Sequence, residues 1–331
     1  MIRASGALLA VLALAVPAAA DPARGPTPRG AAGAIPPPIK IGVSERARLS
    51  IEPSGRRAIH RLAIENPLGD VKVEGYDGTS IQIESHKIAP DEDALDRLHI
   101  SLVPNPDGTV SIKTTADGGK EVHPVGRAAV RIDLLIRAPR DAHVEAAVTS
   151  GTLEVTNMDA GGDLDTGSGP IWVRNVQGEV MTHSISGATR LAQVFGSVDA
   201  QTLTSDVDLD TIGGERLVAS VHHGRIDGRR VRARDVELTT TEGRIVLEAE
   251  AALRGHIMVS SFKGDVDVQL RRHGAVLVRA RGTKLELGAP VRAQPNGWGE
   301  VAFGTGNTTA LVEIRSPQGN VKFAIIETRQ P

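Results

Sequence analysis

The chain of 331 residues carries 38 Lys and Arg against 40 Asp and Glu, a formal net charge of −2. This balance excludes a nucleic-acid-binding protein that works by bulk positive charge. Two Trp, one Tyr and four Phe are too few for base-stacking platforms or aromatic sugar clefts. The absence of Cys excludes disulfides, thiolate nucleophiles and cysteine-bound zinc. With 36 Gly and 19 Pro, the composition indicates many short strands joined by frequent turns.

Residues 1–20 have the layout of a secretory signal peptide. Arg3 supplies the positive charge, residues 7–16 form an apolar run, and residues 17–20 (PAAA) offer a small-residue cleavage site. The alternative, a transmembrane anchor, needs about 20 apolar residues, and no later segment approaches that length. We therefore predict that the mature chain is extracytoplasmic, in the periplasm, on the outer-membrane surface or secreted, and that it has no transmembrane segment.

Residues 21–38 (DPARGPTPRGAAGAIPPP) hold six Pro and three Gly. Such a stretch buries no apolar surface, which predicts a disordered tether with partial polyproline II character. It acts either as a spacer that holds a folded body away from a membrane, or simply as a disordered N-terminus of the mature chain.

Between residues 147 and 288 a small turn residue recurs at a nearly fixed spacing. The successive gaps are 18, 18, 18, 19, 19, 21 and 18 residues. A short strand with alternating apolar residues follows each turn, and a second strand lies about ten residues later. The turn residues are Gly151, Gly169, Gly187, Ser205, Gly224, Gly243, Gly264 and Gly282.

Two strands per period of 18–19 residues predict an all-β fold, a parallel β-helix or β-solenoid, because one unit alone cannot bury its apolar face. Equivalent positions of successive rungs should stack about 4.8 Å apart. Two inward positions hold Thr189 and Gly228, so we expect a thinner core there. Opposite charges on neighbouring rungs favour this register, in the pairs Arg190–Asp208, Asp206–Arg225, Arg244–Asp265 and Asp265–Lys284.

Residues 40–146 follow no such period and are predicted to form a β-rich cap or entry module. Residues 90–98 (PDEDALDRL) predict one short helix, capped by Asp91, with Leu95 and Leu98 on one face. Strands are predicted at residues 70–73, 81–83, 110–112 and 130–136.

Residues 289–331 contain a Gly-rich break followed by short strands, and three of the seven aromatic residues, Trp298, Phe303 and Phe323, are found here. A solenoid needs its open ends covered. We therefore predict that these strands cap the last rung.

The chain resembles a bacterial family of unknown function, the putative adhesins. The resemblance rests on residues 55–73 (GRRAIHRLAIENPLGDVKV), on the following GYDGTSIQIES and on the serial Ser/Thr-Gly strand units, and it covers roughly residues 50–290. Members have a signal peptide or membrane anchor and a β-solenoid or toast-rack body. The resemblance implies an extracytoplasmic β-helical body, and it brings no catalytic residues.

Carboxylates alternate along two predicted strands, at Asp206, Asp208 and Asp210 and at Asp265 and Asp267. A glycosidase needs two carboxyl groups facing each other across a cleft, and a calcium site needs several convergent oxygens. The same outward columns carry neutralising arginines, so we predict a solvated, ion-paired face. These arginines are Arg190, Arg225, Arg229 and Arg244.

Three further patterns are weak. Residues 161–165 (GGDLD) contain one incomplete copy of a calcium-binding repeat, for which a plain turn is the simpler interpretation. His222 and His223 are adjacent on a strand and should point to opposite faces, so they cannot share a metal. Ser168 lies in a turn without an evident base. We therefore predict no catalytic, cofactor-binding or metal-binding residues, no cofactor and no nucleic-acid partner.

Three functions fit these features. The first is a non-enzymatic envelope or surface protein, an adhesin-like binding module or scaffold whose repetitive face binds an envelope protein or a glycan. The second is an accessory domain in envelope-stress signalling. The third is a carbohydrate-active β-helix enzyme, which rests on analogy of fold alone.

Overall fold

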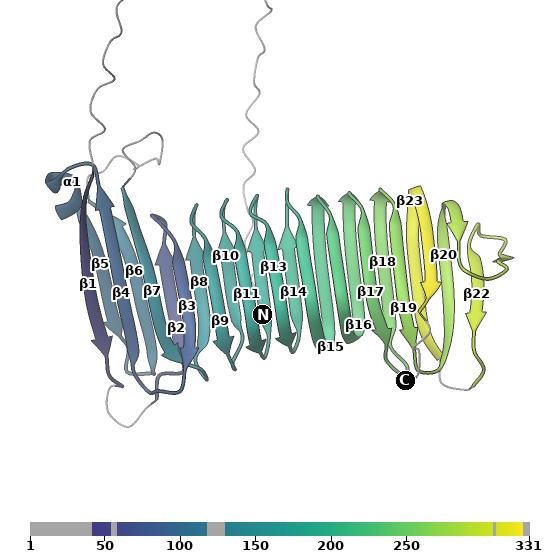
Figure 1. Cartoon of the computed structure of the whole chain (residues 1–331), viewed down its shortest axis with the longest axis horizontal. Helices are drawn as coiled ribbons and strands as arrows, with labels where there is room; N and C mark the ends of the chain where they lie inside the picture. Colours follow the sequence, from purple (N-terminus) through teal and green to yellow (C-terminus); the bar gives the residue numbers. More distant parts are fainter. Residues whose placement is uncertain (1–41, 54–57, 118–129, 307–308, 327–331) are drawn as a thin grey trace, which may run out of the picture. The chain divides into compact units, whose positions relative to one another are not determined.

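The computed structural model describes residues 42–53, 58–117, 130–306 and 309–326. The predicted signal peptide and tether lie outside these residues. The described part is all-β apart from one short helix, α1 (Glu92–Asp96), and its strands stack as a parallel β-solenoid, as the sequence predicted (Figure 1). Within it, no helix is long and apolar enough to cross a membrane.

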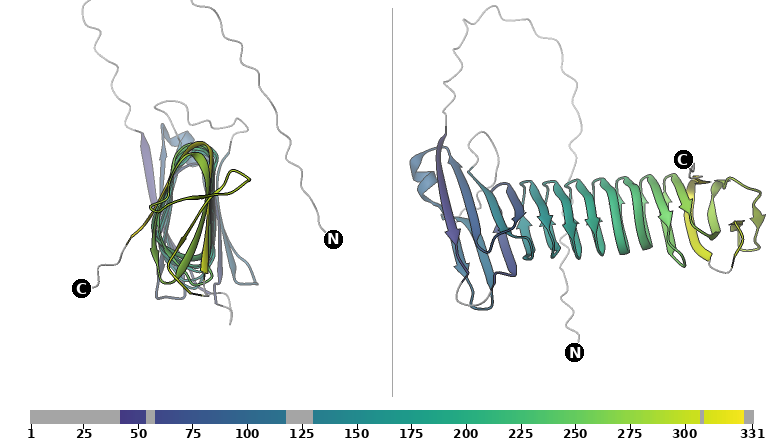
Figure 2. Two further views of the ribbon diagram at one scale, coloured as in Figure 1. Left: turned by 90° about the vertical axis from the view of Figure 1, so that its right-hand side faces the viewer. Right: turned by 60° about the horizontal axis from the view of Figure 1, so that its bottom comes forward.

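Each rung contributes one strand to each of two ladders, which face each other across a narrow core (Figure 2). The first ladder contains, in spatial order, β5 (Leu98–Pro104), β6 (Thr109–Ala116), β2 (Arg61–Asn66), β8 (His143–Val148), β10 (Gly162–Thr166), β12 (Val180–Ser184), β14 (Val198–Thr202), the second halves of β15 (Val207–His223) and β16 (Ile226–Glu242), β18 (His256–Lys263), the first halves of β23 (Thr309–Ile325) and β20 (Ala275–Glu286), and β22 (Gly299–Phe303) with β21 (Arg292–Ala293).

The second ladder contains β1 (Val43–Ile51), β4 (Ile81–Ala89), β7 (Arg131–Pro139), β3 (Val71–Tyr76), β9 (Leu153–Met158), β11 (Ile171–Gln177), β13 (Thr189–Phe195), the first halves of β15 and β16, β17 (Ile245–Ala251), β19 (Val266–Arg272), the second half of β23 and the end of β20.

The inward positions stack in the predicted register. Ile171 pairs with Leu153 and Thr189, and Val207 pairs with Thr189 and Ile226. These side chains are buried and join one core that runs the length of the stack. Its inward surface is apolar because alternate residues of every strand point to the same side.

The two small inward residues are accommodated in different ways, and a thinner core at these positions stays a prediction. Thr189 is buried and its hydroxyl has no hydrogen-bond partner. At Gly228, which has no side chain, Leu247 reaches into the free space. Its Cδ1 lies 3.0 Å from the position that a Cβ on Gly228 would occupy.

A buried hydroxyl and a glycine three residues later form the turn that sets the period. Gly187 donates its N–H to Ser184 Oγ at 2.8 Å, and Gly169 does the same to Thr166 Oγ1 at 3.1 Å. A Cβ on Gly187 would lie only 1.7 Å from the carbonyl oxygen of Gly169. Glycine recurs at this corner because each rung there approaches its neighbour backbone to backbone.

At both ends of the stack a rung is inserted out of sequence order. β2 and β3 lie between the β6–β7 rung and the β8–β9 rung. β23 lies between the β18–β19 rung on one side and β20 on the other. At the C-terminal end the second ladder therefore ends with β20, and the first ladder ends with the antiparallel β22 and the short β21. The predicted division into modules at residues 146 and 288 stays a prediction.

This insertion corrects two details of the sequence analysis. β23, with its buried Phe323, was expected to cover the last rung and instead lies one rung inside it. Lys284 was expected next to Asp265, but Asn320 comes between them and donates its N–H to Asp265 Oδ1 at 2.8 Å. The spacing from Gly264 to Gly282 could not reveal the inserted strand, because a local repeat contains no information on a distant segment that pairs between two rungs.

The single helix forms within the predicted residues 90–98 but ends at Asp96, so Leu98, which was expected on its face, instead begins β5. Asp91 is extended and accepts a hydrogen bond from Ala94 N at 2.8 Å, which satisfies a free donor of the first turn. Ala94 is the buried helical residue, whereas Leu95 is only partly buried.

Candidate functional site

The outward side of the second ladder is a lattice of paired charges. Asp208 accepts from Arg190 at 3.2 Å and lies 3.5 Å from Arg225, and the backbone N–H of Arg225 donates to Asp206 at 2.8 Å. Arg244 pairs with Asp267 at 3.6 Å and not with the predicted Asp265. The aspartates on β15 thus point outward, and each lies beside an arginine.

The same lattice continues on the next outward column. Arg229 holds the nearly buried Asp227 with two hydrogen bonds, of 3.0 and 3.2 Å, and this contact raises the pKa of the Arg229 guanidinium above its ordinary value. Arg230 contacts both oxygens of Asp210. A shallow cavity of about 390 Å³ lies over these residues. Its charges are already satisfied by one another, so it offers little to a ligand.

A second cavity, of about 590 Å³, lies at the N-terminal end and is lined by residues of β1, β4, β7 and β3. It is lined by both signs of charge, among them Arg48 and Glu84, which pair at 3.0 Å, and Asp70 and Asp133, which are both contacted by Arg131. This cavity is an extension of the paired surface.

The outward side of the first ladder differs, because it carries a strip of uncharged hydrogen-bonding groups. His183, Gln201, Ser220 and Thr239 occupy the same position on four successive rungs. A groove of about 250 Å³ follows these residues to the corner of the solenoid. We call His183, Gln201, Ser220 and Thr239 the polar strip.

Beside the polar strip, exposed apolar side chains line the corner. Ile185, Leu203 and Phe262 are 52%, 49% and 54% exposed and follow the buried hydroxyl of their respective rungs. Leu203 also lines the groove, together with His222 and Thr241 of the next two rungs. We call Ile185, Leu203 and Phe262 the apolar corner.

The structure corrects the expectation for the two adjacent histidines. His222 and His223 do not point to opposite faces: both are exposed, and their ring centroids lie 4.2 Å apart in an edge-to-face arrangement. Strand alternation ends at the corner, which is where they lie. His222 contacts Thr241 at 3.0 Å and His223 contacts Glu242 at 3.4 Å.

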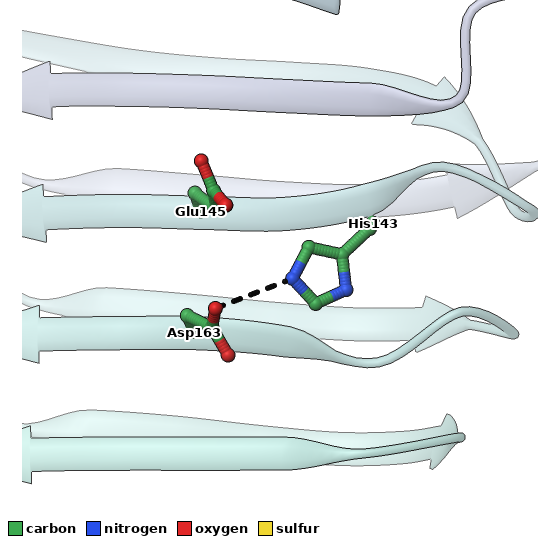
Figure 3. A group of neighbouring side chains, drawn as sticks. All are labelled: His143, Glu145 and Asp163. Carbon is green, nitrogen blue, oxygen red and sulfur yellow. Dashed lines mark ion pairs between the residues drawn. The ribbon is translucent and has the colours of Figure 1, made fainter. Parts of the chain in front are cut away.

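A third feature lies nearer the N-terminal end of the first ladder, where His143, Glu145 and Asp163 come together (Figure 3). One nitrogen or oxygen atom from each lies within 4.8 Å of those of the others. His143 and Glu145 are alternate residues of β8, and Asp163 is the ladder partner of Glu145 on β10. All three side chains are partly exposed on the outward surface.

Sequence reasoning missed this cluster, although the signal was present. Asp163 belongs to residues 161–165, which the sequence predicts to be a turn; residues 162–166 instead form β10, and Gly161 before them has a positive φ of 73°. Adding one period of 18 residues to Glu145 gives Asp163. The recurring turn residues begin at Gly151, after Glu145, so the visibly periodic part of the sequence does not include the first of the two rungs.

Comparisons with known proteins show similarity of structure alone. No family model and no curated protein matches the chain. A putative adhesin from Parabacteroides merdae is 13% identical with a TM-score of 0.44, covering 85% of this chain and 96% of its own. This neighbour carries the same description, putative adhesin, as the family that the sequence resembles.

Two further solved structures have similar coverage. A putative lipid binding protein from Parabacteroides distasonis is 11% identical with a TM-score of 0.42, covering 86% of this chain and 98% of its own. A putative cell adhesion protein from Clostridium sporogenes is 11% identical with a TM-score of 0.25, covering 86% of this chain and 100% of its own.

Proposed function

We propose that the chain is an exported, adhesin-like binding module of the cell envelope or cell surface, and that it holds an extended glycan along the polar strip. The observation that carries this proposal is the alignment of the polar strip on successive rungs beside exposed apolar side chains. His183 contacts Asp165 at 3.5 Å and Gln201 donates to Asp199, whereas the hydroxyls of Ser220 and Thr239 have no hydrogen-bond partner among the described residues.

Hydroxyl-rich polymers suit such a surface. Ser and Thr hydroxyls both donate and accept, and the Gln amide does the same through two different atoms, so each rung offers complementary groups to a sugar hydroxyl. Gln201 already donates to Asp199 at 3.1 Å, which leaves its carbonyl oxygen to accept. Rungs about 4.8 Å apart repeat these groups in a row, which favours a chain-like ligand over a compact one.

The apolar corner supports the same ligand class. Sugar rings have apolar C–H faces as well as hydroxyl edges, and the half-exposed side chain of Leu203 lines the groove beside the polar strip, where it offers such a face an apolar contact. The groove, of about 250 Å³, is lined by residues of four successive rungs, which suits a ligand that lies along the stack. A binding module of this kind works through many weak contacts in series.

The proposal is tested by co-sedimentation of the purified chain with isolated cell-envelope polysaccharide. Replacing Gln201, Ser220 and Thr239 together by Ala should weaken binding at least about tenfold, since three neighbouring rungs lose their hydrogen bonds. The matched control, Arg190→Ala with Asp208→Ala on the opposite surface, should bind as the unmodified chain does. Equal binding by the strip variant would overturn the proposal, as would retention of an envelope protein in place of the polysaccharide.

A further inference from the structure

His143 and Asp163 are placed at the separation of two ligands on one metal ion. His143 Nε2 and Asp163 Oδ2 are 3.5 Å apart, which is too long for a good hydrogen bond. Two ligands that each lie about 2.1 Å from a tetrahedral zinc ion are roughly 3.4 Å from one another. The pair therefore already has the separation of two ligands on one ion, and a Glu145 oxygen lies within 4.8 Å of both.

The imidazole is held in the tautomer that a metal requires. His143 Nδ1 lies 3.0 Å from the carbonyl oxygen of Ala160, which can only accept, so Nδ1 carries the proton. The lone pair of the neutral ring is then on Nε2, the atom that faces Asp163. A backbone carbonyl that fixes the non-coordinating nitrogen is the usual partner of a metal-bound histidine.

The two carboxylates also fit. Arg61 contacts one oxygen of Glu145 and leaves the other, and Figure 3 shows one Glu145 oxygen turned toward His143. Asp163 Oδ1 is buried and has no hydrogen-bond partner among the described residues, an unsatisfied position for a charged oxygen. A cation bound to Asp163 would compensate this carboxylate.

We propose that His143, Glu145 and Asp163 form a surface site for a divalent transition-metal ion of the zinc type. One imidazole and two carboxylates leave a fourth position for water or for a ligand group. The nitrogen ligand favours zinc, copper or nickel over calcium, which takes six to eight oxygen ligands. The site is distinct from the polar strip and does not depend on the glycan proposal.

Isothermal titration of the chelator-treated full chain, without a His tag, with zinc ions alone tests the proposal. We expect one strong site per chain, and His143→Ala and Asp163→Ala should each weaken it at least about tenfold. Calcium should not compete. Because all three side chains lie on the outward surface, far-ultraviolet circular dichroism should show the variants to be folded.

The chain offers a matched control. His183 Nδ1 and Asp165 Oδ1 are also 3.5 Å apart on the same ladder, but they do not belong to a three-residue cluster. His183→Ala should leave the strong site unchanged. The proposal is overturned if His143→Ala binds zinc as tightly as the unmodified chain, or if His183→Ala weakens the strong site as much as His143→Ala does.

Discussion

Two neighbouring residues of β15 provide the sharpest test of which side of the strand faces the core. Leu209 is buried and Asp208 is outward, with a side chain 34% exposed. Changing each to Ala in turn applies the same type of substitution one residue apart. The register predicts very different losses of stability.

The expected losses follow from the surroundings. Truncating a buried Leu to Ala costs about 2–5 kcal/mol, and more when little can collapse into the cavity. The ladder partner of Leu209 on β16 is Gly228, which has no side chain to move, so we expect about 3–5 kcal/mol. Asp208→Ala removes ion pairs with Arg190 and Arg225 on a solvent-exposed surface, which are worth about 0–1 kcal/mol.

The assay is thermal unfolding followed by circular dichroism. At roughly 2–4 °C per kcal/mol for a body of this size, Leu209→Ala should lower Tm by about 6–20 °C and Asp208→Ala by about 0–4 °C. Equal shifts would show that the inward and outward sides of β15 are assigned wrongly, and with them the register of the stack.

Three further predictions concern the turns, the charges and the ends. Gly187→Ala should destabilise the chain strongly, because its Cβ would overlap the backbone of the neighbouring rung. The Cβ of Gly213→Ala would meet only the exposed ring of Phe195, so Tm should change by less than about 2 °C. Comparable Tm shifts for the two variants would refute the backbone contact at Gly187. A hydrogen bond from His273 holds the pKa of Glu250 below its ordinary value of 4.5. The stability that ionised Glu250 contributes is therefore present above pH 4.5 and is lost as the pH falls through the lowered pKa. Between neutral pH and about pH 3, Glu250→Gln should lose less stability than the unmodified chain, and identical acid unfolding profiles would contradict this. Deleting residues 309–331 removes an internal rung and leaves the strand edges on both sides of it unpaired. Unpaired edges promote association, so size-exclusion chromatography should show aggregates. Elution as a monomer would show that β23 is dispensable.

The central stack was predictable because its signal is local. The alternation in each strand and the recurring Gly gave the two-strand rung, the 18–19-residue period and the outward position of Asp208. The reason for the Gly column, a backbone approach one rung away, is visible only in the structure. The inserted rungs at residues 61–76 and 309–325 were not predictable, since pairing between distant segments leaves no mark on a local period.

The candidate sites were less accessible to sequence reasoning. The outward Asp and Arg residues are easily recognised in the sequence, but they lie on the second ladder, where they form ion pairs with one another. The polar strip consists of ordinary Ser, Thr and Gln, which gain meaning only once the register aligns them. His143 and Asp163 are 20 residues apart in the sequence and meet because one turn of the solenoid brings them to neighbouring rungs.

Hydroxyl-radical footprinting of the chain with and without bound envelope polysaccharide tests the central claim most directly, because it reports the solvent exposure of individual side chains. Leu203 and Phe262 in the apolar corner and His183 in the polar strip are exposed in the structure and should become protected. Trp172, which is 45% exposed on the opposite surface, should react equally in both states. Protection of Trp172 with unchanged reactivity of Leu203 and His183 would contradict the proposed binding surface.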